Sequence, residues 1–151
     1  MPALNFKRNF IPLVLDRSKP HTIRQERKYP IKVGDTLQLY YGLRTKSCVL
    51  IATAPCVEIQ KINIYPENKV LLDESWLDGA EIDLLARRDG FKNTPAFFSF
   101  FDETYALPTD NMRLIWWNTS QLKINKSIYN VFPEVWRKEV QGSWEVENVA
   151  K

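Results

Sequence analysis

Three hydrogen-bond donors lie close together near the amino terminus, in the run Lys19-Pro20-His21-Thr22-Ile23-Arg24. If this run enters the core as a strand through Ile23, the two-residue period places Thr22 and Arg24 on one face, with Lys19 in the loop before it. A hydroxyl, a guanidinium and an ammonium can together hold a phosphate or polarise a carbonyl group. Burial can lower the pKa of a lysine enough for it to activate the hydroxyl as a nucleophile. From the residues alone, the alternative is that Lys19 and Arg24 are solvated surface charges.

A single carboxylate, Asp89, is expected at the end of a helix, directly before Gly90 and Phe91. There it meets the negative end of the helix macrodipole, which costs a few tenths to about 1 kcal/mol. A nearby group should therefore compensate the charge. Either a functional site uses the raised pKa for proton transfer, or Asp89 forms an ion pair with Arg87 or Arg88.

Aromatic residues and cations meet at the expected end of another strand, where Tyr40 and Tyr41 precede Gly42. Such a turn suits unpaired bases, because rings stack on the bases while cations hold the backbone. A basic hairpin tip without a ligand has the same composition, so both interpretations stay open. The candidate nucleic-acid contacts are Arg24, Arg27, Lys28, Tyr40, Tyr41, Arg44 and Lys46.

The strands that must position these residues are short. After a helix expected over residues 9–15, opened by Asn9 and with Pro12 in its first turn, the chain enters the strand at residues 21–24. A turn at Gly34 and Asp35 leads into an alternating strand. Further strands are expected over residues 48–54, 56–64, 69–72 and 112–117, with Pro55 separating the first two. Short strands without regular βα alternation predict an α+β fold with a mixed, barrel-like sheet.

Two helices are expected between the last of these strands. Asp78 and Glu81 have the spacing of a capping box, and Gly90 ends that helix. Thr94 and Pro95 form the cap and first-turn pattern of the second helix. Its aromatic residues recur at helical spacing, and we interpret them as core rather than as a base-stacking platform. They are Phe97, Phe98, Phe101 and Tyr105.

The composition of the 151 residues, 44% hydrophobic and 26% charged, predicts one globular domain. No stretch approaches the roughly 20 apolar residues of a membrane span, and the amino terminus lacks an apolar signal region, so we expect a cytoplasmic protein. Cys48 and Cys56 are too few for a disulfide framework, and a lone histidine argues against structural zinc. We therefore predict no metal and no cofactor.

The positive charge is concentrated near the amino terminus. Residues 1–50 hold ten of the 21 Lys and Arg residues but only three of the 18 Asp and Glu residues. Such a bias can attract a polyanion through phosphate contacts and counterion release, and it is equally compatible with an ordinary solvated face.

Taken in chain order, four motifs resemble the ASCH domain family over roughly residues 5–117, in particular the members found in phages and prophages. They are the Lys-x-x-Thr-Ile-Arg run at 19–24, the Gly-Asp-Thr-Leu turn at 34–37, the Tyr-Gly-Leu-Arg-Thr-Lys turn at 41–46 and the Ala-Arg-Arg-Asp-Gly-Phe step at 86–91. The resemblance implies a PUA-like barrel with flanking helices, which we assign to residues 1–117. Residues 118–151 form an extension, with one helix expected over residues 133–140.

The resemblance implies two different functions, nucleic-acid binding and hydrolysis. ASCH proteins are thought to act on RNA or modified nucleosides, so we expect a basic cleft that binds RNA or single-stranded nucleic acid. Small bacterial members include amidohydrolases that remove acetyl from N4-acetylcytidine, and others are associated with RNA cleavage. The amidohydrolase alternative implies Thr22 as nucleophile, Lys19 as its activator and Asp89, in place of the family's Glu, as the group that protonates the leaving amine. A tail that docks a protein partner through Trp136 and Trp144 is a third interpretation.

Overall fold

The computed structural model describes residues 1–134. Its fold is built around one long strand, β4 (Val49–Tyr65). The strands are β1 (Ala3–Phe6), β2 (His21–Gln25), β3 (Thr36–Tyr41), β4 (Val49–Tyr65), β5 (Lys69–Leu72), β6 (Ser75–Trp76), β7 (Met112–Trp117) and β8 (Lys123–Ile124). The helices are α1 (Ile11–Leu15), α2 (Gly79–Arg88), α3 (Thr94–Tyr105) and α4 (Ile128–Val131), with short 3-10 helices at η1 (Arg8–Phe10) and η2 (Thr119–Gln121). The helix expected over residues 133–140 falls mostly outside the described residues, as do Trp136 and Trp144.

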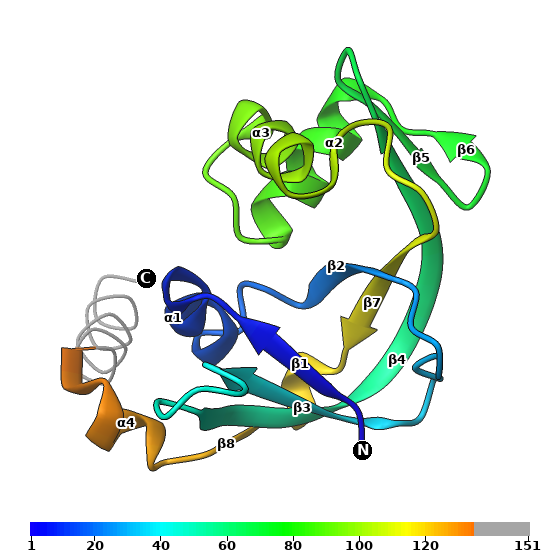
Figure 1. Cartoon of the computed structure of the whole chain (residues 1–151). Helices are drawn as coiled ribbons and strands as arrows, with labels where there is room; N and C mark the ends of the chain where they lie inside the picture. The colour runs from blue at the N-terminus through cyan, green and yellow to red at the C-terminus, as the bar shows by residue number, and fades with distance from the viewer. Residues whose placement is uncertain (135–151) are drawn as a thin grey trace.

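All of these strands belong to one sheet, in which four strands pair with β4. β3 and β8 pair with the first half of β4, and β7 and β5 pair with its second half, all antiparallel. β2 extends β7 and β6 extends β5, also antiparallel, whereas β1 runs parallel to β3. In Figure 1, β4 curves along one side of the molecule and connects the β1–β3 end to the β5–β6 end. This mostly antiparallel sheet with helices confirms the predicted combination of α and β structure.

The sheet is open and does not close into the barrel that the sequence predicts. β1 pairs only with β3, and β2 pairs only with β7, so no strand ladder joins β1 to β2. Two arginines bridge this opening instead, because Arg24 and Arg27 donate to the backbone carbonyls of Asn5 and Ala3. An edge strand carries unpaired carbonyl groups, and these guanidinium groups satisfy two of them.

Pro55 does not separate two strands as expected. β4 runs unbroken from Val49 to Tyr65, and its register shifts between Cys56 and Glu58, where its partner changes from β3 to β7. Proline removes one backbone donor, which a strand tolerates best at such an irregularity. The prediction of two strands separated at Pro55 was therefore wrong.

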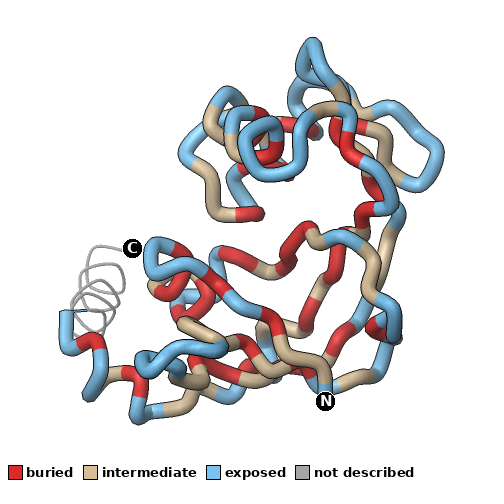
Figure 2. The backbone as a smooth tube through the Cα atoms, in the orientation of Figure 1, coloured by how far each residue is buried: buried red, intermediate tan, exposed pale blue. Residues whose placement is uncertain are grey.

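Two hydrophobic cores lie at opposite ends of β4. The first core joins β1, α1, β3 and the first half of β4, and the second core joins the second half of β4 with α2 and α3. β7 contributes to both, since Trp117 belongs to the first core and Leu114 to the second. Phe91, just after α2, packs against both cores. Figure 2 shows buried backbone segments in both halves of the molecule.

The helix boundaries follow the capping residues. The predicted capping box of α2 is confirmed, with the Asp78 and Glu81 side chains each accepting from the other residue's backbone N–H. α3 begins one residue earlier than expected, because Asn93 rather than Thr94 supplies the side-chain cap. The helix expected over residues 9–15 is instead a 3-10 turn followed by α1, and Asn9 makes no cap bond.

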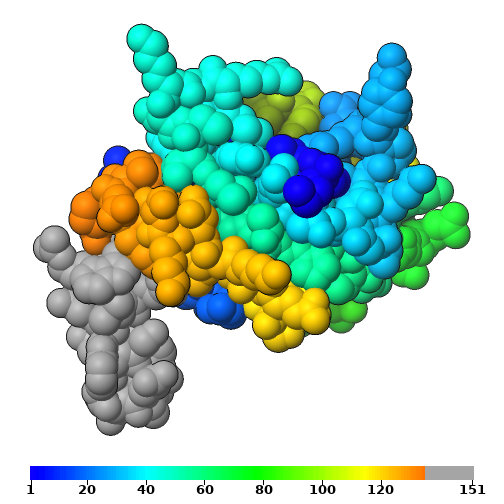
Figure 3. Space-filling model, turned by 90° about the horizontal axis from the view of Figure 1, so that it is seen from below, coloured from blue at the N-terminus to red at the C-terminus, as the bar shows by residue number. Residues whose placement is uncertain are grey.

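Residues 118–134 pack directly on the sheet. β8 pairs with Ala52 and Thr53 of β4, and Ile128 and Phe132 are buried in the first core. Figure 3 shows this segment, in yellow and orange, continuous with the cyan and green surface of β3 and β4. No helix within residues 1–134 has both the length and the apolar character needed to cross a membrane.

Candidate functional site

A cavity of about 170 Å³ lies between the two cores and collects the residues singled out in the sequence. β2 and the loop before it contribute Lys19, Thr22 and Arg24, and the end of α2 contributes Asp89. The remaining lining residues come from β1 and η1 on one side, from the α2–α3 unit on the other, and from β2 in the case of Ile23. They are Asn5, Phe6, Lys7, Phe10, Ile23, Phe91, Phe100, Phe101 and Tyr105.

The floor of the cavity is a buried ion pair. Lys19 and Asp89 retain only 2% and 3% of their accessible surface. The Nζ atom of Lys19 lies 3.0 Å from Oδ1 of Asp89 and also donates to the backbone carbonyl of Asp89. The burial of Lys19 contradicts the interpretation of this residue as a solvated surface charge.

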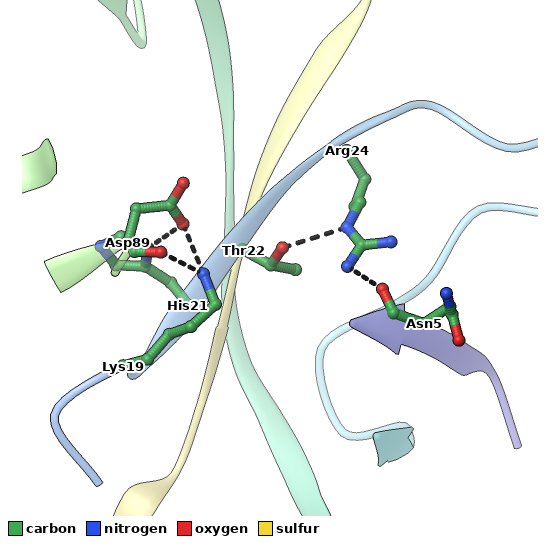
Figure 4. Close-up of polar contacts among 6 residues, drawn as sticks. All are labelled: Asn5, Lys19, His21, Thr22, Arg24 and Asp89. Atoms are coloured by element: carbon green, nitrogen blue, oxygen red, sulfur yellow. Dashed lines mark hydrogen bonds and ion pairs between the residues drawn. The ribbon is translucent and has the colours of Figure 1, made fainter. Parts of the chain in front are cut away.

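Asp89 is held here by the way in which α2 ends. It caps the helix, and Gly90 follows with a φ of +102°, a left-handed conformation that glycine adopts without strain. This turn brings the carboxylate next to the ammonium group of Lys19 (Figure 4). The alternative of a local ion pair with Arg87 or Arg88 is wrong, because Asp89 pairs with Lys19 and His21 instead. Arg87 pairs with Asp83 on the exposed side of the helix.

His21 also contacts the Asp89 carboxylate at the floor of the cavity. Its Nδ1 atom lies 3.2 Å from Oδ1 of Asp89, and its ring meets Trp116 edge to face at a centroid distance of 4.5 Å. The residue is fully buried, and its Nε2 atom has no hydrogen-bond partner within residues 1–134. Asp89 is therefore held by two basic side chains that lie on the same face of β2 and its preceding loop.

Burial and pairing act in opposite directions on these groups. Burial alone would raise the pKa of Asp89, but the charge of Lys19 and the hydrogen bonds from His21 and Lys19 outweigh it and hold that pKa below its ordinary value. For Lys19, burial is the largest effect and lowers the pKa, although the charge and the hydrogen bond of Asp89 oppose it. The floor thus combines a stabilised carboxylate with an ammonium group that gives up its proton more readily than a solvated lysine.

Thr22 and Arg24 lie together on one face of β2, as predicted from the period of the strand. The Nε atom of Arg24 donates to Oγ1 of Thr22 at 3.0 Å, and its NH2 group donates to the carbonyl of Asn5 (Figure 4). Because the threonine hydroxyl accepts from Arg24, its own proton remains available to a ligand or a base. Arg24 also lies over the Phe6 ring, with its Cζ atom 4.9 Å from the ring centroid.

The three predicted catalytic residues share the cavity, but they do not form one hydrogen-bonded chain. Within residues 1–134, Lys19 bonds to Asp89, and Thr22 bonds to Arg24, with no hydrogen bond between Thr22 and either member of the ion pair. The arrangement therefore places a hydroxyl and a buried ion pair at the same cavity without joining them in the absence of a ligand.

Phenylalanine and tyrosine rings form the walls of the cavity. Phe97, Phe98 and Phe101 are buried in the second core, as expected, and Phe101 also faces the cavity. Tyr105 lines the cavity and is 37% exposed, so its interpretation as core was wrong. It lies in a stacked orientation to Phe101, with ring centroids 6.0 Å apart.

The predicted nucleic-acid contacts do not all lie at the cavity. Arg24 lines it, whereas Arg27 binds Ala3 at the open edge of the sheet and Lys28 is exposed next to the Tyr29 ring. Tyr41 packs edge to face on Phe132 and is partly taken up by the first core. Tyr40 is half-buried, and Arg44 and Lys46 are exposed in the turn after β3.

The sequence interpretation missed His21, Asn5 and Lys7 as site residues. The two-residue spacing between Lys19 and His21 was visible in the sequence, but the lone histidine was considered only as a zinc ligand. Asn5 and Lys7 lie in and just after β1, a strand that the sequence pattern did not reveal. Within residues 1–134, no cluster of three His, Cys, Asp or Glu residues could hold a metal ion.

In comparisons with protein-family models, with curated proteins and with solved structures, the chain matches none of them.

Proposed function

We propose that the chain binds an unpaired base of RNA, or the base of a modified nucleoside, in the cavity between the two cores. The observation that carries the proposal is the convergence of Lys19, Thr22, Arg24 and Asp89 on one aromatic-walled cavity. Aromatic side chains stack on bases, and buried donors and acceptors can bind the polar edge of a base.

The size of the cavity favours one small planar group. Its volume of about 170 Å³ is below the roughly 300–1,000 Å³ of pockets that enclose drug-sized ligands. A nucleic-acid duplex cannot enter such a space, whereas a single base turned out of a strand can. Phe100 and Tyr105 on α3 offer ring surface for stacking, and the Thr22 hydroxyl offers both a donor and an acceptor.

The exposed cations around the site suit the rest of the strand. Arg44 and Lys46 lie in the turn after β3, and a backbone bond from Leu43 to the Asn5 side chain, 2.9 Å long, ties this turn to the β1 strand that lines the cavity. Cations at such positions would hold phosphates without reading sequence. The proposal includes membership of the ASCH family and action in the cytoplasm.

A second candidate is hydrolysis of an amide on the bound base, as the resemblance to N4-acetylcytidine amidohydrolases implies. It is favoured by one observation, the burial of Lys19 with a lowered pKa in the same cavity as Thr22. In this reaction the Thr22 oxygen attacks the acyl carbon, and its proton passes to Lys19 in its amine form. The leaving amine then takes a proton from the Lys19–Asp89 pair, and water releases the acyl group from Thr22.

Fluorescence anisotropy with a short labelled single-stranded RNA tests the binding function. We expect Tyr105→Ala to weaken binding by about 5- to 150-fold, since stacking on one aromatic side chain contributes about 1–3 kcal/mol per base. Trp76→Ala is the matched control, because Trp76 is also exposed but lies on β6, outside the cavity. Absence of RNA binding by the wild type at low salt, or equal losses in both variants, would contradict the proposal.

Incubation with N4-acetylcytidine tests the second candidate. Thr22→Val replaces the hydroxyl by a methyl group of similar size, so the shape of the side chain is kept while the nucleophile and the acceptor for Arg24 are lost. We expect release of acetate by the wild type and none by Thr22→Val. Turnover that survives in Thr22→Val excludes Thr22 as nucleophile, and absence of turnover in the wild type removes this candidate for that substrate while leaving base binding in place.

A further inference from the structure

The charges that line the cavity do not balance. Three basic residues and one acidic residue face it. Asp89 is already bound by Lys19 and His21, which leaves Lys7 and Arg24 without a directly paired carboxylate. Within residues 1–134, no carboxylate lies within ion-pair distance of either cation.

Arg24 is a half-buried guanidinium whose hydrogen bonds go to neutral acceptors. Its Nε and NH2 groups bind the Thr22 hydroxyl and the Asn5 carbonyl, and neither acceptor carries a charge. Burial lowers the pKa of Arg24, which is the direction expected for a cation that lacks full compensation. A charge withdrawn from water in this way favours an anionic ligand.

Lys7 lies directly after β1, lines the cavity and is exposed to solvent. Its Nζ atom rests over the Phe100 ring, 5.1 Å from the ring centroid, and it makes no hydrogen bond within residues 1–134. An exposed lysine over a phenylalanine ring is held weakly, and a phosphate oxygen offers a stronger, charge-assisted hydrogen bond. Lys7 can therefore leave the ring for an anion without breaking a hydrogen bond.

The two cations flank the same short strand. Arg24 is fixed to β1 through the carbonyl of Asn5, and Lys7 follows Phe6, the last residue of that strand (Figure 4 shows the Arg24–Asn5 contact). The side chains of Lys19, Thr22 and Asp89 are buried, whereas Lys7 is exposed. A base in the cavity would thus direct its ribose and phosphate outward, toward Lys7.

We propose that Lys7, together with Arg24, binds the phosphate of the nucleotide whose base occupies the cavity. The ligand is then a nucleotide, either free or within an RNA strand, rather than an unphosphorylated nucleoside. This inference rests on the proposed base-binding function and adds to it the group that distinguishes a nucleotide from a nucleoside.

The test compares affinities for the common ribonucleosides, their 5′- and 3′-monophosphates, inorganic phosphate and a short single-stranded RNA, by calorimetry at low salt. We expect at least one monophosphate to bind about tenfold or more tightly than its nucleoside. Lys7→Gln should reduce that gain, because Arg24 is then the only one of the two proposed phosphate ligands that remains. Lys69→Gln is the matched control, because Lys69 is an exposed lysine on β5 that does not line the cavity. Arg24 is not used for this test, since it also holds Thr22 and β1 in place.

The outcomes separate the two proposals. Equal affinity for nucleosides and their monophosphates, or a phosphate preference that Lys7→Gln does not reduce, would overturn the phosphate site and leave base binding intact. Inorganic phosphate that binds as tightly as every nucleotide would instead support the anion site and contradict the base pocket. If the monophosphates gain affinity but RNA does not show the same loss in Lys7→Gln, the source of the phosphate is a free nucleotide. A parallel loss for RNA identifies a nucleotide within a strand.

Discussion

The ammonium group of Lys19 lies 3.0 Å from the Asp89 carboxylate, although the residues are 70 positions apart in the chain. This contact joins the loop before β2 to the end of α2, and so connects the two halves of the molecule at the floor of the cavity. Around this ion pair, the structure assembles the hydroxyl of Thr22, the guanidinium of Arg24 and the aromatic walls.

Removing the carboxylate should destabilise the fold strongly. Asp89→Asn leaves the Lys19 charge buried without its partner, and breaking a buried pair in this way costs about 3–5 kcal/mol. The exposed pair between Asp83 and Arg87 provides the control, since Arg87→Gln should cost less than about 1 kcal/mol. Urea unfolding at neutral pH measures both. Equal, small effects would show that the Lys19–Asp89 contact does not support the fold.

Stability should also fall in acid because of Asp89. Burial raises its pKa, but Lys19 and His21 outweigh that effect, so the folded-state pKa lies below the ordinary value of 3.8. The stabilisation from the ionised carboxylate is therefore complete above the ordinary pKa and is lost as the pH falls through the lower, folded-state value. The difference in unfolding free energy between the wild type and Asp89→Asn should be constant just above about pH 5 and shrink below about pH 4. A difference that grows in acid would contradict a lowered pKa of Asp89 in the folded state.

Gly90 should be intolerant of a side chain. Its φ is +102°, and a Cβ atom there would lie 2.8 Å from the Phe10 ring. Gly90→Ala combines backbone strain with overpacking, and we expect a loss of about 2 kcal/mol or more together with weaker ligand binding. Gly79→Ala, at the start of α2, has nothing within 4 Å of the added methyl group and should be neutral or slightly stabilising. Thermal denaturation of the two variants side by side tests this contrast.

Binding of RNA should depend on salt through the turn after β3. If Lys46 contacts a phosphate, Lys46→Gln should weaken binding uniformly across sequences and reduce the slope of log K against log salt concentration by about 1. Lys69→Gln, on β5, should leave the slope unchanged. A slope that Lys46→Gln does not alter would remove this turn from the proposed interface.

Local patterns in the sequence predicted the local structure well. The period through Ile23 placed Thr22 and Arg24 on one face, and the spacing of Asp78 and Glu81 gave the capping box. Both depend on neighbouring residues alone. The position of Asp89 at a helix end also predicted correctly that another group must compensate its charge.

Long-range relationships were predicted less well, for physical reasons. Lys19 looks like a solvated charge in the sequence because its partner lies in a different part of the chain. β1 has no distinct pattern of its own, since it is a four-residue edge strand that is held by β3 on one side and by two arginines on the other. Asn5 and Lys7 were missed together with this strand. Tyr105 was misassigned because helical spacing alone does not show which side of α3 faces the cavity.

The most direct test of the central claim is an NMR titration of the ¹⁵N-labelled protein with the common ribonucleoside monophosphates and a short single-stranded RNA. If the cavity takes a base, the amide signals of Thr22, Ile23, Phe91 and Phe101 should shift with increasing ligand, and that of Trp76 on β6 should not. Shifts confined to surfaces away from these residues, or no shift with any of the ligands, would contradict a base-binding site at the Lys19–Asp89 cavity.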